Sequence, residues 1–211
     1  MGKKKIILIG GGGHCKSCIE VVHSTGQYEI AGIIDKKEKV GQKVLGYDII
    51  GSDDDLLELR KEYSHALITI GQIKSPRLRE SVFKKLKSLD YNLDPIIAST
   101  AYVSPSASIG EGTIVMHQVM VNTKTTIGDN CILNTKALIE HDVEVASHCH
   151  ISTASVINGD CKIGEGCFIG SNATLSNNIQ VCKETIISMG AIVRKNIETK
   201  GVYTGNPAKQ I

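Results

Sequence analysis

Two adjacent residues, His141 and Asp142, carry side chains suited to proton transfer. An imidazole titrates near neutral pH and can accept a proton from an attacking amine or hydroxyl, while a neighbouring carboxylate holds its tautomer and stabilises the imidazolium. Such a base contributes roughly 10²- to 10⁴-fold to a rate. His117, His148 and His150 lie nearby. Spacing alone leaves each of these histidines as either the base or an ordinary polar turn residue.

A glycine-rich loop at residues 10–13 lies between an aliphatic run and a stretch that predicts a helix beginning near Cys15. Backbone N–H groups and a helix N-terminus then point at the same space, which favours phosphate binding. Asp35 comes 22 residues after Gly13, where a carboxylate can accept hydrogen bonds from ribose or base. Arg77 follows a later aliphatic run and is a candidate phosphate contact.

A nicotinamide dinucleotide is the competing interpretation of these glycines. The G-x-G-x-x-G pattern requires a third glycine where this chain has Cys15 or Lys16, depending on the starting glycine. The region is also short for two mononucleotide-binding halves. A nucleotide or nucleotide-sugar phosphate site is therefore favoured, and a packing turn without a ligand is the remaining alternative.

Cys15 and Cys18 form a C-x-x-C pair flanked by His14 and His23, which raises the question of zinc or redox chemistry. No second ligand pair follows at metal-site spacing. We therefore expect helical residues with a structural role and no bound metal.

The first half of the chain reads as a small Rossmann-like α/β domain over residues 1–97. Aliphatic runs occur at residues 5–9, 30–34, 66–70 and 93–97, with helix-compatible stretches between them. The charge-rich stretches 36–39 and 77–87 are expected to be solvated faces. These elements place the glycine loop at the end of the first strand.

The second half contains a large aliphatic residue at every sixth position from Val103 to Val193, without interruption. The sixteen residues are Val103, Ile109, Val115, Val121, Ile127, Leu133, Ile139, Val145, Ile151, Ile157, Ile163, Ile169, Leu175, Val181, Ile187 and Val193. Small or β-branched residues form a second register four positions after each of them. This period predicts a left-handed parallel β-helix over residues 98–211, ending in a C-terminal tail.

The second register contains four cysteines, Cys131, Cys149, Cys161 and Cys167, which we expect to face inward as small hydrophobes. Three strands per coil place His141 and Asp142 at a corner of the prism. The flat outer faces of such prisms usually pack against copies of themselves, so a homotrimer is expected.

Composition sets the remaining limits. The net charge is +2 and aromatic residues make up 4% of the chain, so no nucleic-acid partner is expected. The aliphatic run of residues 6–9 is too short for a signal peptide or a membrane span. Seven cysteines without a framework pattern favour reduced thiols. We expect a cytoplasmic protein without a membrane partner.

Three sequence motifs, GGGGHCKS, ALIEHD with the following ISTASVINGD, and the C-terminal GVYTGNPAKQI, resemble the bacterial sugar acetyltransferases of the PglD and NeuD group. The resemblance covers essentially the whole chain. It implies a trimeric enzyme with a nucleotide-binding N-terminal domain and a hexapeptide β-helix. The co-substrate is then acetyl-CoA, and the favoured acceptor is the 4-amino group of a nucleotide-linked 4-amino-4,6-dideoxy sugar.

The resemblance also assigns roles in acetyl transfer. His141 matches the general base, and Asp142 stands where many members carry a longer Glu that orients it. His150 matches a histidine near the acetyl thioester. The backbone N–H of Gly159 matches the donor that stabilises the thioester oxyanion.

Further positions are implied for the two substrates. On the nucleotide-sugar side the residues are Gly12, Gly13, His14 and Asp35. Gly190, Arg194 and Lys195 are expected along the coils that receive coenzyme A. O-acetylation of sialic or legionaminic-type acids is an alternative reaction, and a non-catalytic nucleotide-binding scaffold is an alternative of another class.

Overall fold

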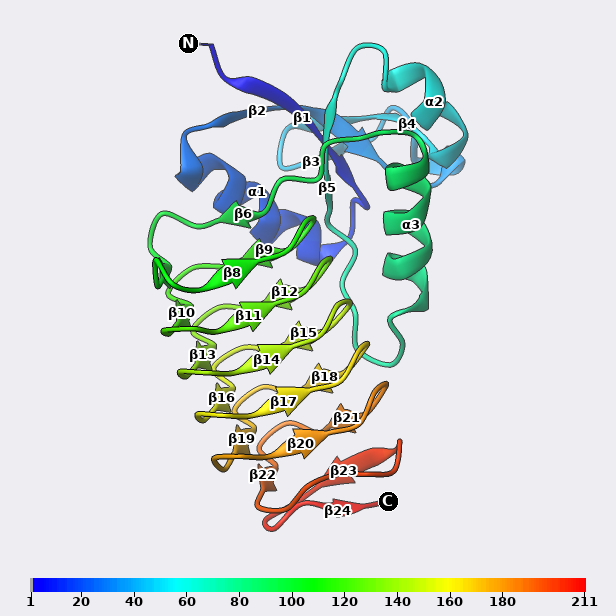
Figure 1. Cartoon of the computed structure of the whole chain (residues 1–211). Helices are drawn as coiled ribbons and strands as arrows, with labels where there is room; N and C mark the ends of the chain where they lie inside the picture. The colour runs from blue at the N-terminus through cyan, green and yellow to red at the C-terminus, as the bar shows by residue number, and fades with distance from the viewer. Residues whose placement is uncertain (1) are drawn as a thin grey trace.

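A computed structural model describes residues 2–211, and it stacks an α/β unit on one end of a long triangular coil (Figure 1). The sheet of the α/β unit, here sheet A, has the strand order β3-β4-β2-β1-β5. Its strands are β1 (Lys4–Ile9), β2 (Tyr28–Ile34), β3 (Lys43–Val44), β4 (Tyr47–Gly51) and β5 (His65–Ile68). The strands are parallel except for the antiparallel pair β3 and β4.

Helices cover both faces of sheet A. Helix α1 (Gly13–Thr25) packs on one face, and helices α2 (Leu56–Leu59) and α3 (Arg77–Ser88) lie on the other, with short 3-10 turns η1 (Lys37–Lys39) and η2 (Asp53–Asp55) between the strands. The buried residues of α1 share one apolar cluster with Ile114 and Ile132 of the coil. The α/β unit is therefore docked on the coil through α1.

The coil has three parallel sheets, named here sheets C, D and E. Sheet D contains β7 (Tyr102–Val103), β10 (Met120–Val121), β13 (Leu138–Ile139), β16 (Val156–Ile157), β19 (Thr174–Leu175) and β22 (Ile192–Val193). Sheet E contains β8 (Ser108–Ile109), β11 (Thr126–Ile127), β14 (Glu144–Val145), β17 (Lys162–Ile163) and β20 (Gln180–Val181).

Sheet C faces the α/β unit. It contains β6 (Ile96–Ile97), β9 (Ile114–Val115), β12 (Ile132–Leu133), β15 (His150–Ile151), β18 (Phe168–Ile169), β21 (Ile186–Ile187), β23 (Val202–Thr204) and β24 (Lys209–Gln210). The predicted hexapeptide β-helix is confirmed. One strand differs from expectation, since Ile96–Ile97 pairs with β9 in the coil. The interpretation of residues 93–97 as a strand of the α/β sheet is wrong.

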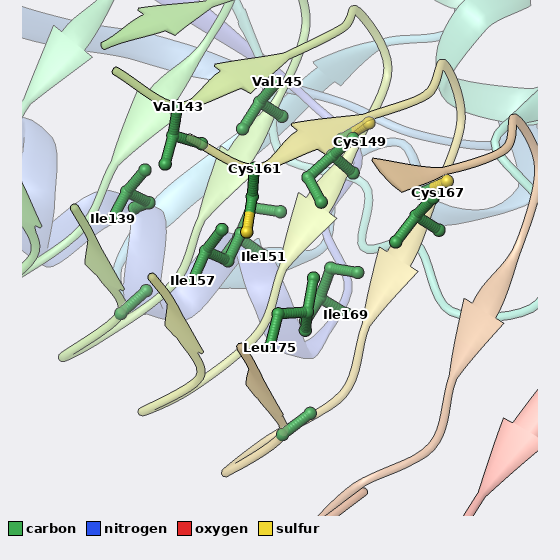
Figure 2. Close-up of a cluster of buried hydrophobic side chains, with 14 of the residues drawn as sticks. Ile139, Val143, Val145, Cys149, Ile151, Ile157, Cys161, Cys167, Ile169 and Leu175 are labelled. Atoms are coloured by element: carbon green, nitrogen blue, oxygen red, sulfur yellow. The ribbon is translucent and has the colours of Figure 1, made fainter. Parts of the chain in front are cut away.

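From Val115 to Val193 each hexapeptide buries the second residue of its strand, as predicted, and stacks it on the equivalent residue 18 positions away (Figure 2). Val103 and Ile109 in the first coil are only half-buried. The fourth residue of a hexapeptide, counted from its buried aliphatic residue, lies at a corner and repeatedly has a left-handed backbone. Examples are Asn130 at φ 53°, Asp142 at φ 58° and His148 at φ 61°. Asn, Asp and Gly tolerate this conformation best, which explains their frequency at the corners.

The inward cysteines lie in the predicted positions, but they are more than small hydrophobes. Cys131 Sγ donates to Ala146 O at 3.3 Å, and Cys149 Sγ donates to Gly164 O at 3.2 Å. Thr113 Oγ1 makes the same bond to Gly128 O at 2.8 Å. In each case the acceptor lies 15 residues further along, at the next coil of the same corner. The thiols therefore satisfy corner carbonyls that the strand ladder leaves free.

Candidate active site

The acid–base pair lies on the corner between sheets D and E, directly after β13. His141 Nδ1 and Asp142 Oδ2 are 2.9 Å apart, and both side chains are about half exposed. The shorter aspartate therefore reaches the imidazole. The hydrogen bond to Asp142 raises the pKa of His141, and this outweighs a small opposing effect of burial. With Nδ1–H donated to the carboxylate, Nε2 is the free proton acceptor.

Gly159 lies one coil beyond His141 at the same corner. A Cβ at residue 159 would stand 2.5 Å from His141 Cε1 and 2.6 Å from its Nε2. The imidazole therefore lies against the glycine backbone, and only glycine leaves room for this ring position. Among residues 2–211, no acceptor is recorded for the Gly159 N–H. A free donor beside the basic nitrogen is what an oxyanion needs.

His150 is not part of this corner. It lies on β15 in sheet C, where its Nδ1–H donates to Gln72 O at 2.5 Å and Asn134 Nδ2 lies 3.2 Å from its Nε2. Burial lowers its pKa to about 4, and the charge of Arg79 adds to this effect. His150 is therefore neutral, with both ring nitrogens in hydrogen bonds.

The glycine loop forms one wall of a pocket at the carboxyl ends of the strands of sheet A. Gly12, Gly13, His14, Asp35 and Ile70 all line it. A Cβ on Gly12 or on Gly13 would meet nothing within 4 Å. Helix α1 begins at Gly13, so its N-terminal N–H groups face this open space. The geometry fits an anion such as a phosphate.

Asp35 holds the glycine loop in place. Its Oδ2 accepts the Gly11 N–H at 2.9 Å and Lys39 Nζ at 3.0 Å, and its Oδ1 accepts the Lys36 N–H at 2.7 Å. Burial raises the pKa of Asp35, but these three hydrogen bonds outweigh it and leave the pKa below its ordinary value. The carboxylate is thus ionised and largely used by the protein itself.

Two basic groups near this pocket differ from their expected positions. Arg77 is not among the pocket-lining residues and lies near Glu184 of the coil instead. Arg79, in a stretch expected to be solvated, is 1% exposed. That expectation is wrong for Arg79, because its side chain points from the first turn of α3 to a coil corner and donates to Asn130. A charged residue in an amphipathic stretch offers no sequence signal for this.

The expected coenzyme A contacts lie at the lower end of the coil. Arg194 and Lys195 follow β22 at the corner between sheets D and E, and Gly190 precedes β22 with a left-handed backbone. Lys195 stands in the same corner position as His141 and Gly159, 54 residues after His141. His141, Gly159 and Lys195 therefore form one column along this corner of the coil.

One group of potential metal ligands occurs among the described residues: Glu80, His148 and Glu165. Asn130 Oδ1 accepts Arg79 Nη2 at 2.9 Å, so Asn130 Nδ2 must face His148 Nδ1, 3.0 Å away. Nδ1 of His148 is then an acceptor, and the proton of the neutral ring is on Nε2. The nitrogen that faces Glu165 is a donor, which does not suit a cation.

None of the helices within residues 2–211 is both long and apolar enough to cross a bilayer.

Two family models match the chain, the PglD N-terminal domain over residues 5–86 and the GMPPB C-terminal domain over residues 97–205. A solved structure of a histidine-to-asparagine variant of perosamine N-acetyltransferase from Caulobacter crescentus, in complex with CoA and GDP-perosamine, is 32% identical with a TM-score of 0.92. The match covers 100% of this chain and 97% of that chain. The chain belongs to the PglD-type sugar N-acetyltransferases.

Two other members of this family are also similar to the chain. The acetyltransferase domain of PglB from Neisseria gonorrhoeae, in complex with acetyl coenzyme A, is 30% identical with a TM-score of 0.92, and the match covers 100% of both chains. UDP-N-acetylbacillosamine N-acetyltransferase from Bacillus subtilis is 27% identical over 113 residues, 54% of this chain and 51% of that protein. The chain spans about half the length, or less, of the curated relatives it matches.

Three residues of the site region escaped the sequence reasoning: Gln72, Asn134 and Arg79. Gln72 and Arg79 are ordinary polar residues of a loop and a helix, and they gain their positions only when the β5–α3 segment lies against the coil. Asn134, 16 residues before His150, would have been accessible from coil spacing alone.

Proposed function

We propose that the chain transfers the acetyl group of acetyl-CoA to the 4-amino group of a nucleotide-linked 4-amino-4,6-dideoxy sugar. The observation that carries this proposal is His141, oriented by Asp142 over the backbone of Gly159, on a chain whose N-terminal domain, proposed from the sequence as residues 1–97, also has an open glycine loop at the start of a helix. Support comes from the full-length likeness to a protein solved with CoA and GDP-perosamine.

In the proposed reaction, His141 Nε2 takes a proton from the sugar amine as the amine nitrogen bonds to the thioester carbonyl carbon. The Gly159 N–H donates to the oxyanion that forms. The C–S bond then breaks, and the imidazolium returns the proton to the departing thiolate. Asp142 stabilises the imidazolium between these steps. The products are an amide and coenzyme A, without a covalent enzyme intermediate.

The pH dependence should follow the contact between His141 and Asp142. Because Asp142 raises the pKa of His141, the imidazole stays protonated and inactive to a higher pH than an isolated one. In Asp142→Asn the pKa falls, so the acidic limb of kcat/KM should move to lower pH while the maximal rate decreases. The pH–rate profile measures this.

Asp160→Asn is the matched control for Asp142→Asn. Asp160 occupies the same corner position one coil further on, also with a left-handed backbone at φ 58°, and affects His141 only through its charge. The acidic limb of the pH–rate profile should therefore move less in Asp160→Asn than in Asp142→Asn. An unchanged limb in Asp142→Asn would show that Asp142 does not govern the titration.

The phosphate cradle makes a separate prediction. In Gly13→Ala the new methyl group meets no protein atom within 4 Å, and alanine favours the helix that begins there. Thermal stability should be unchanged or slightly higher, whereas calorimetry should show about tenfold weaker binding of GDP or UDP, because the methyl group fills the anion space. Ser17→Ala, on the exposed side of the same helix, should bind normally. Equal affinity in Gly13→Ala would place the phosphates elsewhere.

The proposed homotrimer rests on the outer face of sheet D. Its outward side chains form an apolar ladder of Tyr102, Met120, Leu138, Val156, Thr174 and Ile192. Tyr102 is 52% exposed and Met120 is 44% exposed. The α/β unit covers sheet C from β9 to β15, and sheet E carries polar residues such as Glu144 and Lys162. Sheet D is thus the face suited to self-association.

A threefold axis along sheet D has a direct consequence for the site. The corner between sheets D and E of one copy, with His141, then lies beside the corner between sheets C and D of the next copy, with Asn134. His150, which is bonded to Asn134, would enter the active site of the neighbouring copy. This arrangement explains how His141 and His150, on different sheets of one prism, could serve one thioester.

The column of His141, Gly159 and Lys195 suggests that coenzyme A lies along this corner of the coil. Three coil steps separate His141 from Lys195, about 14 Å at the usual strand spacing of roughly 4.8 Å. The thioester at His141 would leave the phosphates of coenzyme A beside Arg194 and Lys195, with Gly190 on the facing corner of the next copy.

The decisive experiment measures coenzyme A release with acetyl-CoA and a panel of GDP-, UDP- and TDP-linked 4-amino-4,6-dideoxy sugars. Release with at least one of them, and an amide at C4 by mass spectrometry, is the expected result. Sialic and legionaminic acids form the second arm of the panel, and release only with these would assign O-acetylation instead. No release with any acceptor would leave a binding scaffold.

A further inference from the structure

Arg79 joins the nucleotide pocket to the coil from a fully buried position. It lies in the first turn of α3 and is 1% exposed. Its Nη1 donates to Ile68 O at 2.9 Å and to Ile70 O at 2.7 Å. Its Nη2 donates to Asn130 Oδ1 at 2.9 Å and lies 3.4 Å from Asn130 O. One guanidinium therefore holds the end of β5 and a coil corner at the same time.

The segment that Arg79 holds on the sheet side belongs to the pocket. Thr69, Ile70 and Gly71 line the space in front of the glycine loop. Gly71 also contacts His14, where a Cβ on residue 71 would lie 3.6 Å from the Cβ of His14. The distance from this wall to the coil is thus set by the reach of one rigid guanidinium fork.

Every acceptor of Arg79 is a carbonyl or amide oxygen rather than a carboxylate. Burial lowers the pKa of Arg79 to about 10, which still leaves it charged at neutral pH. A buried charge without a carboxylate is costly, and apolar packing would stabilise a fold better. A role in function explains why such a group occurs here.

A second set of bonds closes the connection. Asn130 is fully buried, and its Nδ2 donates to His148 Nδ1 on the next coil at 3.0 Å. His148 O accepts Gln72 Nε2 at 2.8 Å, and Gln72 O accepts the His150 Nδ1–H. The β5–α3 loop is thereby tied to two successive corners of the coil.

We propose that Arg79 is a positioning residue for acetyl transfer: through Asn130 it fixes the wall of the nucleotide pocket at a set distance from the acetyl-transfer coil. The nucleotide-linked sugar must reach from this pocket to His141 on the coil of one of the copies in the proposed trimer. A loosened pocket wall would therefore misplace the sugar amine. This consequence for turnover rests on the proposed function, whereas the clamp itself does not.

Asn130 offers a matched pair of variants that leave Arg79 in place. Asn130→Gly suits the left-handed backbone at φ 53° and removes the side-chain acceptor of Arg79. Asn130→Asp keeps an acceptor for Arg79, now a carboxylate that pairs with the guanidinium, and replaces the donor to His148. Arg79→Lys is a further variant, which keeps the charge but cannot span Ile68, Ile70 and Asn130 at once.

The expected result is a separation of binding from turnover. In Asn130→Gly, kcat should fall about tenfold or more, as for loss of a charge-assisted hydrogen bond that orients a reactant, while the Kd values for GDP, UDP and acetyl-CoA stay within about threefold. Asn130→Asp should retain kcat within about threefold, and Arg79→Lys should lie between the two.

Hydrogen exchange of two amides that flank the β5–α3 loop, Thr69 N–H bonded to Ile9 O at 2.9 Å and Glu80 N–H bonded to Pro76 O at 2.9 Å, supplies a readout that needs no turnover. Exchange should be faster in Asn130→Gly than in the wild type or in Asn130→Asp. Unchanged exchange and unchanged kcat in Asn130→Gly would overturn the proposal, as would an equal loss of kcat in Asn130→Asp. If the wild type acetylates no acceptor, the proposed function fails, and the exchange data still decide whether the clamp exists.

Discussion

Replacement of His141 with alanine should lower kcat by about 10²- to 10⁴-fold, the range for loss of a general base. The KM for acetyl-CoA should change little, because the proposed phosphate contacts of coenzyme A, Arg194 and Lys195, lie three coils beyond His141. Because the His141 side chain is about half exposed, the fold should survive the change. Coenzyme A release in the steady state measures the effect.

His23→Ala is a suitable control for His141→Ala. His23 lies at the far end of α1 and bonds to Tyr47, away from the pocket and the corner. The His23→Ala variant should therefore release coenzyme A at the wild-type rate. Near-normal turnover by a folded His141→Ala protein would exclude His141 as the base and return His117, His148 and His150 to consideration.

Gly159→Ala should be the second most damaging change, with kcat lowered by about 10- to 100-fold. The new methyl group would stand 2.5 Å from His141 Cε1, far inside van der Waals contact, so the imidazole must rotate away from its position between Asp142 and the Gly159 N–H. A shift of about 1 Å in a reacting group can cost about 10²-fold. Steady-state kinetics and the thermal midpoint should be measured together.

The half-exposed ring can move into solvent, so Gly159→Ala should unfold close to the wild-type temperature. Lys183→Ala, exposed at the corner between sheets E and C and away from this column, should keep both rate and stability. The double variant His141→Ala with Gly159→Ala should be little slower than His141→Ala alone. The losses in rate from residues that act together are not additive, since removing one of them already abolishes the shared effect. Additive losses would mean that Gly159 acts independently of His141.

Much of the fold was accessible from residue spacing. Sixteen aliphatic residues at a period of six predict the coil because each hexapeptide buries one large side chain and stacks it on an identical neighbour. Strand β4 was missed because its apolar pair, Ile49 and Ile50, is shorter than the strand pattern that periodicity detects. Ile96–Ile97 was assigned to the wrong sheet because a buried two-residue strand looks the same in either one.

The site was accessible only in part. A period of 18 residues already places Gly159 next to His141, since one coil returns the chain to the same corner. The role of Asp35 was less clear, because the pattern of a glycine loop and a distant acid does not reveal that the carboxylate bonds to Gly11, Lys36 and Lys39. Those donors come from two loops whose distance depends on the sheet.

The sequence by itself determined the coil, its corners and the column that carries His141, because a repeat makes local and global structure the same problem. The tertiary structure alone decided which faces of that coil stay open. Helix α1 packs on β9 and β12 of sheet C, α3 buries Arg79 against Asn130, and Tyr102 and Met120 of the sheet D ladder stay exposed. These contacts join residues far apart in the chain, and no period relates them, so only the packed structure could bring them together.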